Sequence, residues 1–140
     1  MKTVNRTKEI VGARAMIESL RQNKVPFSFA TGALPKPAIA KLQQCDIWYD
    51  EALLATSKTH ESREGFVMDA IVRAKRYYNR NNFDRIISVG DGVWDMKTAH
   101  NLNLDFVGIG SKYASYFKNN GVKECYEDMN TFSRTLMSKT

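Results

Sequence analysis

The sequence has little of what disulfide-rich or membrane-spanning proteins depend on. It contains only two cysteines, Cys45 and Cys125, which are too few for a disulfide-stabilised scaffold. No apolar run approaches the roughly 20 residues that a bilayer crossing needs. Residues 1–9 are polar and charged rather than signal-like. These absences predict a cytoplasmic protein with reduced thiols and no membrane partner.

Flexible linkers, internal repeats and low-complexity segments are also absent from the sequence. A length of 140 residues, 43% of them hydrophobic, therefore predicts one domain spanning residues 1–140. The formal net charge is +6, but the basic residues are scattered. Their densest group has the spacing of a solvated helix face, so no nucleic-acid partner is predicted; it consists of Arg73, Lys75, Arg76 and Arg80.

Apolar periodicity predicts helices and short strands that alternate almost throughout the chain. Strands are expected at residues 25–30, 85–89, 105–109 and 123–126, with ambiguous strand-like stretches at 46–49 and 53–55. Helices are expected at residues 8–22, 35–42, 62–78, 96–102, 112–119 and 130–138. This order is typical of an α/β, three-layer, Rossmann-like sandwich with a mostly parallel sheet, in which ligands bind beyond the carboxyl ends of the strands.

Acidic residues and glycines follow the apolar strand at 85–89, in the stretch Gly90-Asp91-Gly92-Val93-Trp94-Asp95. Two carboxylates near one strand end suit a Mg²⁺ ion, which prefers hard oxygen ligands. Trp94 is interpreted as a packing residue rather than a substrate contact. Asp95 also fits the N-cap of the helix expected from residue 96, a common use of aspartate. This stretch is the strongest candidate site in the sequence.

Two further segments fall at the same predicted edge of the sheet. The strand at 25–30 runs into Thr31-Gly32, where a hydroxyl and a backbone N–H can bind a phosphate oxygen or simply start an ordinary turn. The loop before the helix at 62–78 holds Lys58, His60 and Arg63. His60 is interpreted as a solvent-facing loop residue.

Taken in this order, these motifs resemble the haloacid dehalogenase-like superfamily, whose members are mostly phosphohydrolases. The resemblance runs from about residue 12 to residue 128. It implies that Thr31 and Gly32 bind the phosphate of a small phosphorylated molecule. Arg63 and Lys58 compete for the role of the cation that neutralises phosphoryl charge.

The same resemblance implies that Asp91 and Asp95 are the Mg²⁺ ligands. In the family, however, the first strand ends in an Asp-x-Asp pair that supplies the nucleophile and the general acid and base. No Asp-x-Asp occurs anywhere in the 140 residues. The chain is therefore expected to be the C-terminal part of a longer enzyme, lacking strand one and the cap. Alone it is expected to be inactive and to bind Mg²⁺ weakly or not at all.

Two functions stay open: a phosphohydrolase that is active once the missing segment is supplied, and a non-catalytic binding or scaffold module of the same fold. A response-regulator-like receiver has the same layer architecture, but it needs an acidic cluster that this sequence lacks. The strands at 25–30 and 85–89 would also lack the central neighbour between them. This predicts self-association or a complementing chain, unless the sheet closes up or residues 1–4 fill the slot.

Overall fold

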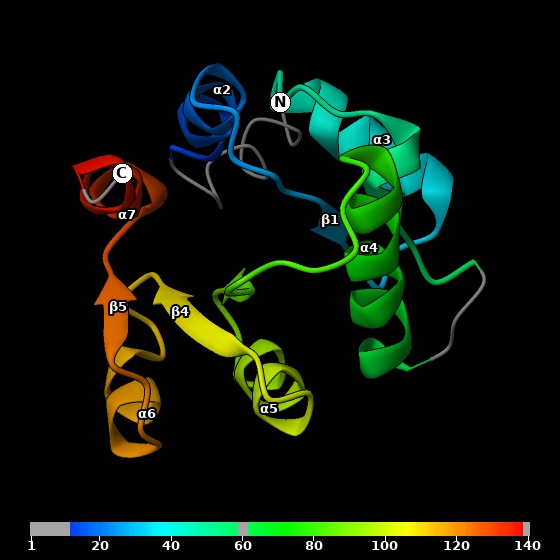
Figure 1. Cartoon of the computed structure of the whole chain (residues 1–140). Coiled ribbons are helices and arrows are strands. Elements are labelled where there is room, and N and C mark those ends of the chain that lie inside the picture. The colour runs from blue at the N-terminus through cyan, green and yellow to red at the C-terminus, as the bar shows by residue number, and fades with distance from the viewer. Residues whose placement is uncertain (1–11, 59–61, 139–140) are drawn as a thin grey trace. The chain divides into compact units, whose positions relative to one another are not determined.

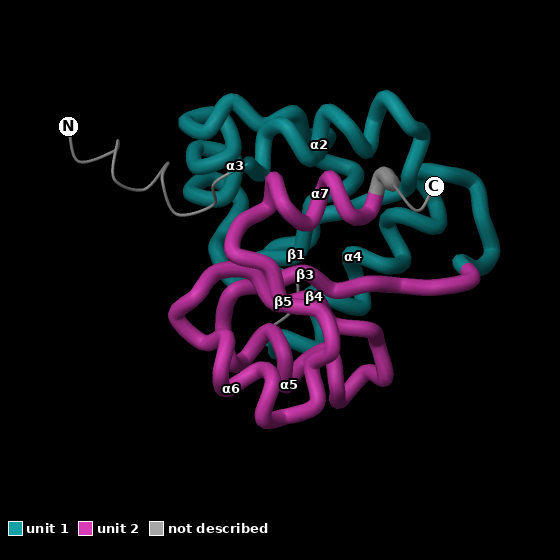
Figure 2. Tube along the Cα trace, turned by 90° about the vertical axis from the view of Figure 1, so that its left-hand side faces the viewer, with its two compact units in different colours: residues 1–83 teal, residues 84–140 magenta. Residues whose placement is uncertain are grey.

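The computed structural model describes residues 12–58 and 62–138 (Figure 1). The chain divides into two compact units, unit 1 at Met1–Phe83 and unit 2 at Asp84–Thr140 (Figure 2). Each unit alternates strands with helices, and every strand pair in the described residues is parallel. The chain is therefore a mixed α/β protein, the class that the alternating pattern predicts.

Unit 1 contains a two-stranded parallel sheet against which one long helix packs. Strand β1 pairs with β2, so that Phe29 lies opposite Leu54. Helix α4 contacts both strands and buries Phe66 and Ala70 with Ala55 in one apolar cluster. The elements in chain order are α2 (Ala13–Gln22), β1 (Phe29–Ala30), α3 (Pro35–Gln44), the 3₁₀ helix η1 (Glu51–Leu53), β2 (Leu54–Ala55) and α4 (Arg63–Tyr77).

Unit 2 contains a three-stranded parallel sheet in the order β3-β4-β5. Its elements are β3 (Ile87–Gly90), α5 (Val93–Asn101), β4 (Asp105–Ile109), α6 (Ala114–Asn119), β5 (Glu124–Tyr126) and α7 (Met129–Ser138). The core contains Phe117, which is fully buried and packs edge-on against Phe106. The other buried members of this cluster are Met96, Ala99 and Val122.

The strand expected at 25–30 is wrong in extent, because only Phe29–Ala30 pairs with β2. Pro26 has no N–H to donate to a strand partner. The Phe27 N–H donates instead to the Tyr78 hydroxyl oxygen, 3.3 Å away. Burial raises the pKa of Tyr78, and the hydrogen bond from Phe27 opposes that rise. The ambiguous stretch at 46–49 forms no strand either.

The apolar composition of the strands expected at 25–30 and 85–89 is typical of strands buried on both faces, but both are less buried than that. All of β3 is half-buried, and Ala30 of β1 is exposed. Within the described residues, β1 pairs with β2 in unit 1 and β3 pairs with β4 in unit 2, so each lies at the end of its own sheet. An end strand leaves one row of backbone groups open. Residues 1–4, the alternative partner, lie outside the described residues.

The helices follow the expected pattern more closely than the strands do. Helices α3, α4, α6 and α7 each begin and end within two residues of the expected bounds. Helix α2 ends at Gln22 as expected, and residues 8–11 of the expected helix lie outside the described part. Helix α5 begins at Val93, three residues before the expected start. None of the described helices combines the length and apolar character that a membrane crossing needs.

A residue with a left-handed backbone lies just beyond the end of four helices. This conformation lets the next N–H reach back to the last turn, as when the Val25 N–H donates to the Leu20 carbonyl at 2.9 Å. Non-glycine residues pay a steric penalty of about 1 kcal/mol there. The four residues, with φ between 54° and 57°, are Lys24, Asp46, Asn79 and Asn103.

Candidate functional site

Both strands of unit 1 end in a threonine whose hydroxyl oxygen closes a turn. Thr31 follows β1, and its Oγ1 accepts a hydrogen bond from the Ala33 N–H at 3.1 Å. Thr56 follows β2, and its Oγ1 accepts from the Lys58 N–H at 3.3 Å. The Thr31 N–H donates to the Ala55 carbonyl at 3.0 Å, so the pairing continues up to the turns. Two neighbouring parallel strands therefore end in the same hydroxyl turn.

These two turns also hold each other in place. The Ser57 N–H donates to the Ala33 carbonyl at 3.1 Å. A threonine hydroxyl that accepts from a backbone N–H keeps its own hydrogen to donate elsewhere. Thr31 and Thr56 therefore place two hydroxyl groups at the carboxyl ends of adjacent strands, where α/β proteins bind ligands. The geometry is that of the ordinary turn, in which each hydroxyl oxygen accepts from a backbone N–H.

Thr56 was not among the residues expected from the sequence, although a signal for it exists. The Ala30-Thr31 pair at the end of β1 recurs as Ala55-Thr56 at the end of β2. Thr56 is also one of two buried polar side chains in the described residues. The recurrence of a short polar residue after each apolar stretch is therefore the sequence signal for Thr56.

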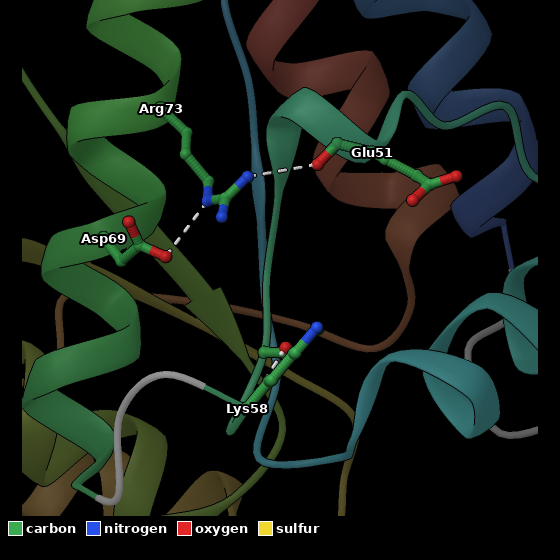
Figure 3. A network of polar contacts seen from close by, with 5 residues as sticks. Glu51, Lys58, Asp69 and Arg73 are labelled. Carbon is green, nitrogen blue, oxygen red and sulfur yellow. Dashed lines mark hydrogen bonds and ion pairs between the residues drawn. The ribbon is translucent and has the colours of Figure 1, made fainter.

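The two competing basic residues also lie in unit 1. Lys58 is exposed in the loop after β2 (Figure 3). Arg63 is exposed as the first residue of α4, which begins where Ser62 Oγ accepts from the Gly65 N–H at 2.9 Å. His60, between them, lies outside the described residues. The choice between Lys58 and Arg63 therefore stays open.

Arg73 lies on α4 and differs from the solvated cation that its spacing predicts. Its Nε lies 3.0 Å from the Asp69 carboxylate, and its Nη1 donates to the Glu51 carbonyl at 3.2 Å (Figure 3). The Arg73 and Asp69 side chains are only 31% and 20% exposed. Arg73 therefore fastens η1, and with it the start of β2, to helix α4.

In unit 2, the carboxylates that follow β3 lie in a tight loop and the first turn of α5. Asp91 is exposed. Asp95 Oδ2 accepts a hydrogen bond from the Gly92 N–H at 3.0 Å, and Gly92 is the N-cap residue of α5. The interpretation of Asp95 as an N-cap is therefore wrong, because the helix begins earlier. Asp95 instead supplies the reciprocal half of a capping box, in which the third helical residue bonds back to the cap.

Glycine is required at position 90 by the closeness of Asp95. A Cβ atom added at Gly90 would lie 2.5 Å from the Asp95 Cβ atom, and contacts this short do not occur between real side chains. Gly32 is different, since the nearest atom to an added Cβ would be Phe66 Cζ at 3.6 Å. Gly90 therefore serves the loop around Asp95, whereas Gly32 has no steric reason to be glycine.

Asp91 and Asp95 supply only two carboxylates, which is a small set of ligands for a metal ion. Across residues 12–58 and 62–138, no group of three or more His, Cys, Asp or Glu side chains could hold one. One oxygen of Asp95 is already bonded to the Gly92 N–H. Two carboxylates are nevertheless a usual protein contribution to Mg²⁺ when substrate phosphate and water complete the shell. Asp91 and Asp95 therefore remain the candidate Mg²⁺ ligands that the sequence predicts, and no third acidic, histidine or cysteine ligand joins them in the described residues.

Trp94 is not the packing residue that the sequence suggested. Its side chain is 59% exposed, and it does not belong to the buried cluster of unit 2. The Lys97 ammonium lies 4.6 Å from the centre of its ring. The helix starts early enough to place Trp94 on the outer face of α5, away from Met96.

The six expected site residues divide between the two units. Unit 1 holds Thr31, Gly32, Lys58 and Arg63, and unit 2 holds Asp91 and Asp95. No family model, curated protein or solved structure matches this chain. A functional interpretation therefore depends on the residues and their geometry within each unit.

Proposed function

We propose that this chain is a haloacid dehalogenase-like phosphohydrolase module that binds phosphorylated small molecules and does not hydrolyse them by itself. The observation that carries the proposal is the pair of hydroxyl turns at Thr31 and Thr56. Their hydroxyl groups, with the cations Lys58 and Arg63 of the same unit, have the chemistry of an anion site. The proposed fold is a Rossmann-like sandwich, and the parallel strand–helix–strand order of each unit supports it.

The proposal assigns Asp91 and Asp95 of unit 2 to a weak Mg²⁺ site. A carboxylate nucleophile of the family type would come from an Asp-x-Asp pair, which the 140 residues do not contain. Without a group to attack phosphorus, positioned phosphate and metal ligands bind the ester but leave it intact. Binding without turnover is therefore the expected behaviour of this chain.

Phosphate binding is tested by titrating inorganic phosphate into the full chain and following the heat released. We expect Thr31→Val and Thr56→Val each to weaken binding by about tenfold, because a hydrogen bond to a charged group is lost. Thr135→Val in α7 of unit 2 removes the same atoms at a residue that the proposal does not assign to the site, and it should leave the affinity unchanged. Unaltered affinity in both of the first two variants would contradict the proposal.

Catalysis is tested with phenyl phosphate in millimolar Mg²⁺. We expect no release of phosphate above background and only weak Mg²⁺ affinity. Turnover that disappears in Asp91→Asn would show that the chain has another route, such as a metal-activated water. Micromolar Mg²⁺ affinity that disappears in the same variant would show that the two carboxylates bind more strongly than expected.

We also propose that the chain associates with itself or with a complementing chain through its strand edges. In the described residues, β1 and β3 each have a strand neighbour on one side only, and open edges invite pairing. Sedimentation at micromolar concentration should show a dimer or larger species. A stable monomer with a cooperative melt above about 60 °C would contradict this expectation.

A further inference from the structure

Asn23 and Asn120 end helices α2 and α6 with the same set of hydrogen bonds. In both, the side-chain Nδ2 donates at 2.8 Å to the main-chain carbonyl four residues earlier. The N–H of the next residue, Lys24 or Gly121, donates at 3.2 Å to the carbonyl three residues before it. Lys24 and Gly121 both have a left-handed backbone, with φ of 55° and 85°. The two helix ends therefore match, except for the side chain that follows the asparagine.

We propose that Asn120 and Gly121 form a self-modification site, at which the Asn120 side chain deamidates with the Gly121 backbone nitrogen as the nucleophile. That nitrogen bonds to Asn120 Cγ and gives up its proton, while the bond from Cγ to Nδ2 breaks and ammonia leaves with the proton. Water then opens the cyclic imide that has formed. Water attack at Cγ gives aspartate, and attack at the main-chain carbonyl carbon gives isoaspartate.

The absence of a side chain at Gly121 is what makes this pair reactive. A side chain on the attacking residue crowds its nitrogen as it approaches Cγ, and glycine has none. In the described part of the chain, no atom beyond its chain neighbours lies within 4 Å of the place that a Cβ would take at Gly121. The residue after Asn23 is Lys24, whose side chain shields the same nitrogen. The chemistry therefore selects Asn120 over Asn23.

The folded helix end slows the reaction without preventing it. The Asn120 Nδ2 is held by the Tyr116 carbonyl, and the Gly121 N–H is held by the Lys118 carbonyl. Both hydrogen bonds must open before the nitrogen reaches Cγ. Helix α6 is six residues long and Asn120 is exposed, and such helix ends open far more often than a core does. The rate of deamidation therefore follows how often this turn is open.

Deamidation changes the turn that leads from α6 into β5. Aspartate or isoaspartate at position 120 has no amide to donate to the Tyr116 carbonyl. It also places a negative charge at the carboxyl end of a helix, where the helix dipole disfavours it. The same turn contains the buried Val122, whose N–H donates to the Phe117 carbonyl at 3.0 Å. Loosening this turn therefore weakens a contact to the core of unit 2.

The test incubates the full chain at neutral pH and follows both asparagines by peptide mass spectrometry. A zero-time sample corrects for modification during digestion, and enzymatic methylation detects isoaspartate. We expect Asn120 to be converted and Asn23 to react far more slowly. Conversion of Asn120 should be about tenfold faster in urea, because the turn is then open all the time. An Asn120 that is not converted, or that is converted no faster than Asn23, would overturn the inference.

Exchanging the following residues tests the cause. Gly121→Lys should protect Asn120, and Lys24 shows that this kind of turn accepts a lysine. Lys24→Gly should transfer the reactivity to Asn23, and it keeps the test decisive if Gly121→Lys does not fold. An Asn23 that stays as slow in Lys24→Gly as in the unaltered chain, in urea as well as in buffer, would contradict the proposed role of glycine.

The structural consequence is tested with Asn120→Asp, which reproduces one of the two products. We expect faster hydrogen exchange at residues 117–122, because the turn has lost a hydrogen bond and gained an unfavourable charge. Asn23→Asp is the matched control, and it should leave exchange in unit 2 unchanged. Unchanged exchange at residues 117–122 in Asn120→Asp would overturn the link between this modification and the core of unit 2.

Discussion

Units 1 and 2 share one construction, parallel strands joined through helices, but end their strands in opposite chemistry. Unit 1 places Thr31 and Thr56 after its strands, and unit 2 places Asp91 after β3. Residues 1–83 carry 14 Lys and Arg against 8 Asp and Glu, whereas residues 84–140 carry 7 of each. The whole net charge of +6 therefore lies in unit 1. Hydroxyls and cations favour an anion, and carboxylates favour a cation.

The two units also differ in what holds them together. Unit 2 has three strands and an aromatic centre at Phe117, and unit 1 has two very short strands with Leu53 as its most buried large side chain. Unit 1 compensates with polar contacts such as those of Arg73. The two units therefore differ both in the side chains that follow their strands and in the contacts that stabilise them.

The largest expected effect concerns the two cores. Phe117→Ala in unit 2 should lower the free energy of unfolding by about 3–5 kcal/mol, and Leu53→Ala in unit 1 by about 2–4 kcal/mol, because each leaves a cavity at a fully buried site. Denaturant titration measures the loss, and peptide-level hydrogen exchange locates it. The two cores would not be separate if Phe117→Ala reduced the protection of backbone amides from exchange equally in unit 1 and unit 2.

Glycines provide the next contrast. A Cβ added at Gly108 would lie 2.4 Å from Phe117 Cδ2, so Gly108→Ala should cost about 1–3 kcal/mol through overpacking. Gly32→Ala in unit 1 should be neutral or slightly stabilising, since its surroundings have room. Thermal melts distinguish the two. An equal loss of stability in both variants would contradict the claim that the surroundings of Gly32 have room for a side chain.

Ion pairs should give smaller effects. Arg73→Gln should cost about 1 kcal/mol, because it removes the Arg73 contacts to the half-buried Asp69 carboxylate and to the Glu51 carbonyl. Arg85→Gln should cost about 0.5 kcal/mol, because Arg85 and Asp105 are 56% and 54% exposed and solvent screens their pairing. Unfolding at low and high salt checks this order, and a larger loss for Arg85→Gln would reverse the comparison.

Helix ends should give effects of the same small size as the ion pairs. Lys24 adopts a left-handed backbone in unit 1, with φ of 55°, and Asn103 does so in unit 2, with φ of 57°. Lys24→Gly should raise stability by up to about 1 kcal/mol, because glycine adopts this conformation without a steric penalty. Asn103→Gly should change little, since asparagine tolerates it. A melting temperature that falls in Lys24→Gly would contradict this.

The sequence predicted the helices well because their signals are local. Ser62 and the periodic apolar residues after it define α4, and the apolar run at 105–109 gives β4 its bounds. The strand predicted at 25–30 is too long because its extent depends on which backbone N–H groups have strand partners. The Phe27 N–H donates instead to the Tyr78 hydroxyl, 51 residues away in the sequence. That contact has no local signal.

The candidate site was predictable in part. Thr31 and Asp91 were identified because each directly follows an apolar stretch. Thr56 was not among the predicted residues, although the repeated Ala-Thr pair is a sequence signal for it. The exposure of Trp94 depends on where α5 begins, and a shift of three residues in that start changes which face carries the ring.

One ³¹P NMR experiment tests the central claim, that this chain binds a phosphate ester and leaves it intact. Phenyl phosphate is added to the full chain with Mg²⁺, and its signal is followed over hours. The expected result is a concentration-dependent shift of the ester signal, weakened in Thr31→Val and Thr56→Val, with no inorganic phosphate appearing. An ester signal that never shifts, or inorganic phosphate that accumulates unless Asp91 is changed to asparagine, would contradict the account.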